Sequence, residues 1–246
     1  MQTTLKIGAF LLLATMAAYG QARLDGVIDI HAHTAPDSTA RSIDAIDRAK
    51  LAKQRGMRGL VLKNHYESTA ALAYVVRKEV PGIEVFGGID LNRSVGGINP
   101  AAVGRMILMQ GGWGRVVWMP TFDAENQVRF SKEDRPFVAV AKDAMSPPVR
   151  MTIPQMQEAA HEGAYIEFVY SALLGPNGLK IKDYVEAIRT LGARSCILSS
   201  DLGQPGNPLH PDGLAAFFEA LRKEGLSDAD IDLMSKTNPA RALGLE

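Results

Sequence analysis

The chain has 246 residues, and its 27 lysines and arginines are balanced by 27 aspartates and glutamates, so the formal net charge is zero. A hydrophobic fraction of 46% with 22% charged residues is typical of a globular protein with one substantial core. The neutral balance disfavours nucleic acid as a partner, because nucleic-acid-binding domains carry a basic stripe or patch. The single cysteine, Cys196, excludes an internal disulfide.

The first 22 residues predict an export signal. Lys6 precedes an apolar run over residues 7–18, and small residues that suit cleavage follow at 18–20 and 20–22. The run is shorter than the about 20 apolar residues that a membrane-spanning helix needs. We therefore expect a signal peptide at 1–22, a periplasmic or secreted protein without a stable membrane span, and one domain over 23–246. The alternative is an uncleaved helix that packs on the domain.

Short apolar runs alternate with amphipathic segments in the first half of the domain. Strands are predicted at 26–30, 57–62, 83–89 and 116–118. Helices are predicted from Ser42, over 68–78 and from Asn99, where Asn99-Pro100 supplies the cap and first-turn proline of a helix start. We interpret the pair Gly87-Gly88 as a backbone turn rather than as a phosphate-binding loop.

The second half continues the alternation. A weak strand at 137–140 is followed by strands at 165–170 and 195–198, and helices are predicted over 153–162, 181–188 and 214–221, and from the Ser227–Asp230 capping box. Repeated strand–helix units predict an α/β domain with a parallel sheet, which both an open doubly wound sheet and a closed barrel satisfy. No G-x-G-x-x-G follows the first strand, so a dinucleotide-binding fold loses its main support.

The strongest chemical pattern is Asp29-Ile30-His31-Ala32-His33, at the end of the first predicted strand. Side chains two positions apart in a strand point to the same face, so Asp29, His31 and His33 are expected to lie together. Active sites of α/β barrels lie at the carboxyl ends of the strands. Two imidazoles there can hold one metal ion, and a nearby carboxylate can orient the imidazoles. Alternatively, both histidines bond only to backbone.

Further polar residues follow other predicted strands. Lys63 and His65 share parity at the end of the second strand, where Lys63 could bind a substrate anion, become carboxylated and bridge metals, or extend to solvent. Asp201 follows the last strand and could ligate the metal and accept a proton from water, or could cap the next turn. Glu167, inside an apolar strand, needs a partner.

Three other polar residues have weaker patterns. Asp37, in the turn after the first strand, is placed near the mouth of the site with a role in substrate binding. His161, at a helix end, is expected in solvent, and His210 either at the rim of the site or on the surface.

Together these residues resemble the amidohydrolase superfamily of metal-dependent hydrolases. The resemblance rests on His31-Ala32-His33 after the first strand, Asp201 after the last and the closing helix 238–245. Segments such as 33–37 and 61–65 resemble more closely an uncharacterised bacterial branch of that superfamily. The resemblance implies a TIM-barrel-like (β/α)8 fold with one or two divalent metals, and an enzyme that hydrolyses an amide, ester or lactone.

One departure from the family pattern concerns the missing histidines. The superfamily supplies two more histidines, from its fifth and sixth strands, but none lies between His65 and His161 here. The region 121–151 is also too short for the strand–helix units expected there, so we predict a barrel lacking about two units near Asp143–Met145.

The resulting hypothesis is an exported metallohydrolase. His31, His33 and Asp201 hold a divalent metal, most simply zinc, and Asp201 acts as base. Lys63 takes part in catalysis, whereas His65, Glu167 and Asp37 contact a small-molecule substrate. The alternatives are a metal-dependent decarboxylase and a degenerate, non-catalytic barrel that binds a ligand or partner; self-association into a homo-oligomer is a further possibility.

Overall fold

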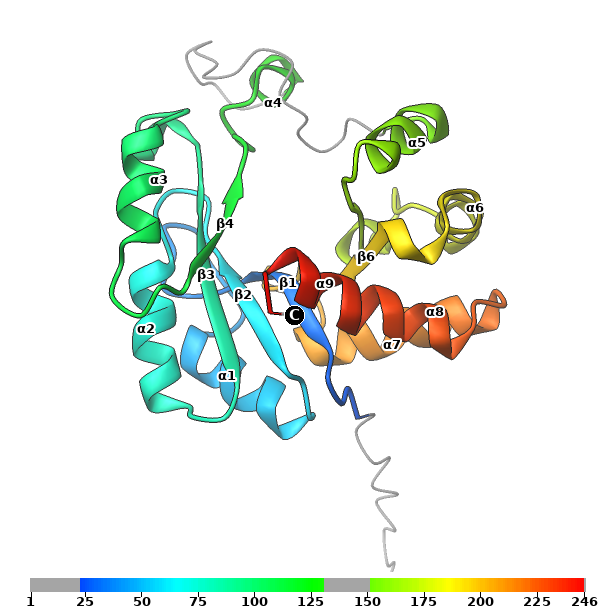
Figure 1. The fold of residues 1–246 in the computed structure, drawn as a ribbon, viewed down its shortest axis with the longest axis horizontal. Coiled ribbons are helices and arrows are strands. Elements are labelled where there is room, and N and C mark those ends of the chain that lie inside the picture. The colour runs from blue at the N-terminus through cyan, green and yellow to red at the C-terminus, as the bar shows by residue number, and fades with distance from the viewer. Residues whose placement is uncertain (1–22, 131–150, 246) are drawn as a thin grey trace, which may run out of the picture.

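The computed structural model describes residues 23–130 and 151–245. The predicted export signal at 1–22, the weak strand at 137–140 and the proposed position of the missing units, Asp143–Met145, lie outside these residues. The described part is an α/β fold in which parallel strands form a curved inner layer and helices lie outside it (Figure 1).

The strands form two parallel sheets, one with the order β1-β2-β3-β4 and one with the pair β5-β6. Their bounds are Ile28–His33 for β1, Gly59–Lys63 for β2, Glu84–Asp90 for β3, Gly114–Trp118 for β4, Ile166–Val169 for β5 and Cys196–Ser199 for β6. Strand β1 extends further than the sequence pattern indicated, so both predicted histidine ligands lie on the strand itself.

The helices alternate with the strands as predicted. Their bounds are Ala45–Gln54 for α1, Ala70–Glu79 for α2, Pro100–Ile107 for α3, Glu125–Phe130 for α4, Ile153–His161 for α5, Ile181–Leu191 for α6, His210–Lys223 for α7, Asp228–Asp232 for α8 and Asn238–Ala242 for α9. A π-helical segment, Leu233–Thr237, joins α8 to α9. None of the helices in the described residues combines the length and apolar character that crossing a bilayer requires.

The two sheets meet where β1 lies beside β6. Ala32 forms a parallel bridge with Leu202, the His33 N–H donates to the Leu202 carbonyl at 2.9 Å, and the Asp201 N–H donates to the His31 carbonyl at 2.8 Å. The strands therefore follow one another around the curve as β4-β3-β2-β1-β6-β5. The first and last strands of the fold are neighbours, as a barrel requires.

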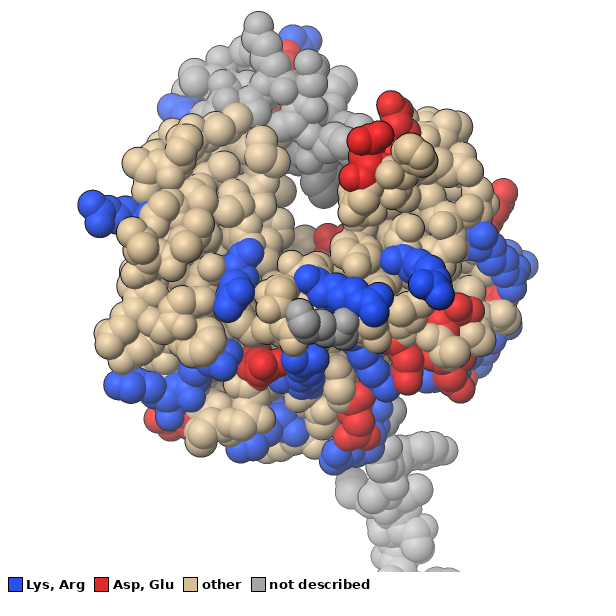
Figure 2. Space-filling view, viewed as in Figure 1, with Lys and Arg blue, Asp and Glu red and all other residues tan. Residues whose placement is uncertain are grey.

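The barrel is incomplete within the described residues. Six strands are present there, whereas a (β/α)8 barrel has eight, and the curve is open between β4 and β5. Figure 2 shows the opening between the part of the molecule formed by α3 and β4 and the part formed by α5. This arrangement agrees with the predicted barrel lacking about two strand–helix units.

The core lies between the strands and the outer helices. Leu60 and Leu62 on β2, Leu198 on β6 and Phe217 on α7 are fully buried in its largest cluster. A smaller cluster on the other side of the strands packs Ala240 and Leu243, from α9 and its end, against residues of β1, β2 and β3, namely Ile28, Val61 and Phe86. Packing on both sides explains the nearly continuous apolar character of these strands.

Two local expectations are wrong. Gly87 and Gly88 lie inside β3 instead of forming a turn, and both positions lack room for a side chain: a Cβ on Gly87 would meet the Thr69 backbone at 2.5 Å, and one on Gly88 the Trp118 ring at 2.3 Å. Helix α1 begins after Asp44, not at Ser42, because the Asp44 carboxylate caps the helix by accepting the N–H groups of Ile46 and Asp47.

His210 is also placed differently from the prediction. It lies at the start of α7, where it is fully buried and neither ring nitrogen has a hydrogen-bond partner among the residues that the structure describes. Burial and the nearby Arg48 and Arg55 hold its pKa well below the usual value. His161, by contrast, is exposed as expected.

Replacing His210 with leucine is expected to reduce the loss of stability on acidification. In the wild-type protein the unfolded chain binds a proton near pH 6.5 that the folded chain excludes, so the free energy of unfolding falls as the pH drops below that value, by about 1 kcal/mol or more at pH 5. Urea unfolding at pH 7.5 and pH 5 measures the difference. The exposed His161→Leu variant is the control, and equal acid sensitivity of His210→Leu and wild type would contradict the expectation.

Candidate metal centre

The carboxyl ends of β1 and β6 bring three potential metal ligands together. The Asp201 Oδ1 atom lies 3.1 Å from Nε2 of His31 and 3.0 Å from Nε2 of His33. One donor atom from each of the three residues lies within 4.8 Å of the others. Ligands about 2.1 Å from a shared ion in tetrahedral or octahedral geometry are separated by roughly 3.0–3.4 Å, so these distances suit a single cation.

The electrostatics of this group also favour a cation. Burial and the Lys63 ammonium would lower the pKa of His31, but the carboxylates of Asp201 and Glu167 outweigh them and raise it to about 9. Burial alone would raise the pKa of Asp201, yet the two imidazoles hold it well below its usual range. The group therefore stabilises a positive charge beside two carboxylates. Two imidazoles with one carboxylate are typical ligands of zinc and related divalent metals.

Glu167 orients His31 from the opposite side of the ring. Its Oε1 atom lies 3.3 Å from Nδ1 of His31 and accepts a 2.5 Å hydrogen bond from the Ser199 hydroxyl. A carboxylate on the second nitrogen of a ligating histidine fixes the tautomer that leaves the first nitrogen free for the metal. The place of Glu167 in an apolar strand, β5, predicted that its carboxylate has a partner, and that partner is the ligand His31.

Replacing Glu167 with glutamine is expected to weaken divalent-metal binding by about tenfold or more, because loss of a charged orienting partner typically has that effect. The side chain keeps its shape, so the fold is retained. Isothermal titration with zinc or cobalt measures the change, with the exposed Glu162→Gln as control. Unchanged affinity in Glu167→Gln would show that Glu167 does not orient His31.

Lys63 projects from the end of β2 into the same group. Its side chain is 3% exposed, and its Nζ lies 3.1 Å from Nε2 of His31 and 4.0 Å from the buried Asp90 carboxylate. The ammonium also lies 5.1 Å from the centre of the Trp118 ring, a cation–π distance. Of the alternatives for Lys63, extension into solvent is excluded by this position.

His65 lies next to Lys63 and is held by residues that the sequence analysis did not single out. Its Nδ1 is 3.1 Å from the Asp90 carboxylate and 3.0 Å from the Thr121 hydroxyl, which itself donates to Asp90. The His65 ring also lies beside the His33 ring in a tilted arrangement, with centroids 4.7 Å apart, and meets the Phe122 ring edge-on at 4.5 Å. Asp90 ends β3, so the rule that polar residues at strand ends form the site would have found it.

These side chains line one cavity of about 230 Å³. The volume suits a small molecule rather than a polymer. Its lining comes from the ends of β1 and β2, from the segments after β2, β4 and β6, and from α4: His31, His33, Lys63, His65, Thr121, Phe122, Gln127, Asp201 and Gln204.

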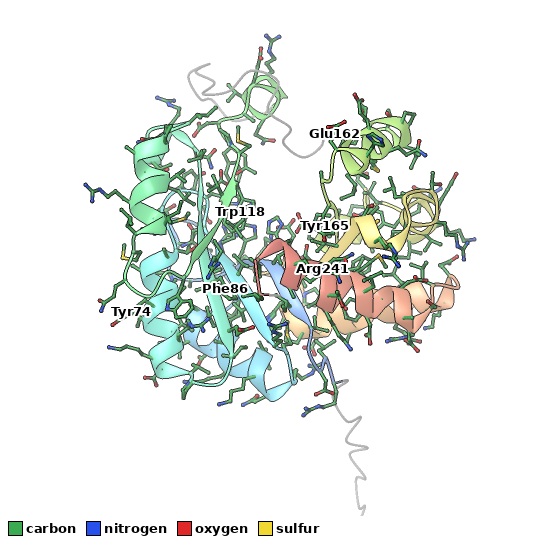
Figure 3. The ribbon with its side chains drawn as sticks, in the orientation of Figure 1. Tyr74, Phe86, Trp118, Glu162, Tyr165 and Arg241 are labelled. Atoms are coloured by element: carbon green, nitrogen blue, oxygen red, sulfur yellow. The ribbon has the colours of Figure 1, made fainter. Side chains whose placement is uncertain are left out.

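A second cavity, of about 420 Å³, lies against β5, α5 and α6 and is lined mainly by apolar side chains together with Glu167. Figure 3 labels Trp118 on β4 and Tyr165 before β5, which lie on opposite sides of the opening between these strands. The metal ligands line the smaller cavity, and we therefore assign the chemistry to that one.

Two acidic residues predicted near the ligands make other contacts. Asp37 pairs with Arg41 at 2.6 Å, and both side chains are buried. Asp29 is fully buried, and its Oδ1 accepts the N–H groups of His31 at 3.2 Å and Ser200 at 3.0 Å. A register shift between Asp29 and Ala32 interrupts the regular alternation of β1, so Asp29 fastens β1 to the end of β6.

Solved structures match this arrangement of strands at low sequence identity, and the following three are described as enzymes. A β-aspartyl dipeptidase from Fervidobacterium islandicum AW-1 matches with a TM-score of 0.57 at 16% identity over 89% of this chain and 74% of its own. A putative 2-pyrone-4,6-dicarboxylic acid hydrolase from Pseudomonas putida matches with a TM-score of 0.56 at 16% identity, over 90% of this chain and 98% of its own. A 2,6-dihydroxybenzoate decarboxylase from Rhizobium matches with a TM-score of 0.53 at 12% identity, over 90% of this chain and 99% of its own.

The chain has the fold of the amidohydrolase superfamily. Residues 26–146 also match the model of a family of unknown function, DUF6282. No curated protein matches the sequence. Within this fold, the His31–His33–Asp201 group lies where the sequence resemblance places its metal ligands, on the first strand and just after the last.

Proposed function

We propose that this protein is a metal-dependent hydrolase that cleaves an amide, ester or lactone bond in a small molecule. The observation that carries the proposal is the position of Asp201 Oδ1 about 3 Å from Nε2 of both His31 and His33. Relatives in fold that are described as a dipeptidase and a hydrolase support the reaction class. The predicted signal at 1–22 supports action outside the cytoplasm.

The ligand set suits one divalent metal, for which zinc is the simplest choice. When bound, such an ion supplies positive charge that acidifies water and polarises a carbonyl. Three protein ligands leave a position open for water and substrate.

The protein's own groups divide the remaining tasks. Asp201 accepts a proton from the attacking water, while the Ser171 hydroxyl donates to its Oδ2 at 2.6 Å and keeps the carboxylate in place. Lys63 presents an ammonium to negative charge that develops on the substrate, and His65, fixed by Asp90 and Thr121, offers a hydrogen bond from the cavity wall.

A metal-dependent decarboxylase is the second candidate. The Lys63 ammonium inside the cavity suits a substrate carboxylate, and one solved structure of the same fold is described as a decarboxylase. Release of carbon dioxide without uptake of water distinguishes the two reactions.

A screen of the metal-loaded mature protein tests the proposal. The protein, reconstituted with zinc, manganese or cobalt, is assayed against ester, lactone and amide panels by pH-stat, and against aromatic carboxylic acids for carbon dioxide release. We expect hydrolysis that disappears in His33→Ala. Turnover of carboxylic acids alone would favour the decarboxylase. A loaded protein that binds small molecules without converting them would contradict both and favour a non-catalytic barrel.

A further inference from the structure

Arg48 is a buried arginine whose contacts are made with the strand ends that carry the metal ligands. It lies on α1 and is fully buried. Its Nη2 donates to the His33 carbonyl at 2.5 Å and lies 3.3 Å from the Leu202 carbonyl. His33 is a ligand and Leu202 follows the ligand Asp201, so one guanidinium bonds to the backbone at both ligand strands.

A gain in stability alone does not explain why the Arg48 side chain is buried. Within the described part of the chain, Arg48 Nε and Nη1 are buried without a hydrogen-bond partner. Burial lowers its pKa to about 10, although Asp29 acts in the opposite direction. A buried charge with unpartnered donors destabilises a fold unless other interactions offset the cost, and an apolar side chain in its place is often neutral or favourable.

The chain after β6 packs closely against Arg48 at Gly203. A Cβ on Gly203, which has a φ of +135°, would come within 2.0 Å of the His33 carbonyl oxygen and 2.8 Å of Arg48 Nη2. Asp201, with a φ of 48°, is the one non-glycine residue with a left-handed backbone in residues 23–130 and 151–245. The ligand Asp201 thus occupies a backbone conformation that the surrounding contacts must maintain.

Asp29 is a second buried acidic or basic residue that bonds to both β1 and the chain after β6, at positions earlier along the chain than those that Arg48 contacts. Asp29 accepts the N–H groups of His31 on β1 and of Ser200 after β6. Asp29 therefore bonds to both chains just before the ligands, and Arg48 bonds to both at or just after them. The two opposite charges also attract each other through the interior.

We propose that Arg48 is a positioning residue for the metal centre, which fixes the His33 and Leu202 carbonyls relative to each other so that His33 and Asp201 present their ligand atoms to one ion. This inference rests on the proposed metal site. It adds that the distance between the two ligand strands is set by a side chain outside the cavity.

The test compares Arg48→Met with Arg55→Met. Arg55 follows α1, has a side chain that is 4% exposed and pairs with Asp212 at 2.5 Å, so its loss removes a comparable buried arginine that touches neither His33 nor Leu202. Both variants are measured for unfolding in urea without metal, for zinc affinity by chelator competition, and for the visible absorption spectrum of the cobalt form. The spectrum reports the geometry of the ligands around the ion, which general destabilisation leaves unchanged.

We expect Arg48→Met to bind zinc about tenfold or more weakly than wild type and to change the cobalt spectrum. Arg55→Met is expected to bind within about twofold of wild type with the same spectrum, whatever its stability. If Arg48→Met does not fold, Arg48→Lys is compared with Arg55→Lys. The lysine ammonium is a single point charge, whereas the planar guanidinium of Arg48 contacts two carbonyls, so Arg48→Lys is expected to bind zinc roughly threefold more weakly than wild type.

Equal zinc affinity and equal spectra in the Arg48 and Arg55 variants would overturn the positioning role and leave the proposed function intact. A folded wild-type protein that binds no divalent metal would overturn both.

Discussion

Replacing Asp201 with asparagine is expected to weaken divalent-metal binding more than 100-fold and to lower turnover roughly 1,000-fold. The first effect follows because Asp201 Oδ1 is shared between the two imidazoles, so its charge is the one that both ligand histidines face. Removal of a directly ligating carboxylate should lower the metal affinity by more than the roughly 10–100-fold that is typical of losing a partner that only orients a ligand. The second follows because the same carboxylate is the proposed base, a role worth about 100- to 10,000-fold.

The Asp201→Asn variant should remain folded. Asparagine adopts left-handed backbone readily, and the Asp201 N–H bond to the His31 carbonyl does not depend on the side chain. Zinc titration and assay of the best substrate measure the two effects, and near-ultraviolet circular dichroism checks the fold. Retention of metal with loss of turnover would assign Asp201 to proton transfer alone; retention of both would contradict its place in the site.

Replacing Lys63 with methionine is expected to change metal affinity and turnover in opposite directions. The Lys63 Nζ lies 3.1 Å from the His31 atom that would face the metal, so removing its charge removes repulsion of the ion. Zinc affinity should rise by roughly tenfold, since like charges at this range in a partly buried site interact by more than about 1 kcal/mol. Turnover should fall roughly 100-fold, the typical effect of losing one group that stabilises developing negative charge.

Zinc titration and steady-state kinetics measure this split, and the surface variant Lys50→Met on α1 is the control. Weaker zinc binding by Lys63→Met would contradict a role as a free ammonium. It would favour the other reading of the sequence, in which Lys63 is carboxylated and contributes to the metal site.

The ligand group could be predicted from the sequence because it depends on a simple rule. His31 and His33 stand at the end of an apolar strand near the start of the domain, and Asp201 stands at the end of the last one. Parallel strands bring their carboxyl ends to one edge, so these residues meet whenever the first and last strands are neighbours. The contacts between β1 and β6 confirm that condition. Within the described residues, the opening between β4 and β5 agrees with the expectation, drawn from the short region between Thr121 and Met151, that about two strand–helix units are missing.

The residues that support the ligands could not be predicted in the same way. Arg48 is one cation on an amphipathic helix, and only the packing of α1 turns it inward toward His33 and Leu202. The shift in register within β1 moved Asp29 away from the imidazoles, although regular alternation placed it beside them. His210 follows a loop, where the hydrophobic pattern carries no information about burial.

Glu167 illustrates an intermediate case. A carboxylate inside an apolar strand indicates a buried partner, and the structure identifies that partner as His31. Its identity depends on β5 lying next to β6 and β6 next to β1, a three-dimensional relation that the local sequence around Glu167 does not contain.

The metal content of the purified mature protein shows whether His31, His33 and Asp201 hold an ion. Wild type, His31→Ala and Asp201→Ala are measured side by side by inductively coupled plasma mass spectrometry, with circular dichroism to confirm that each is folded. We expect about one divalent ion per chain in the wild type and loss of that ion in both variants. A well-folded wild-type protein that neither carries nor takes up a divalent metal would contradict this expectation.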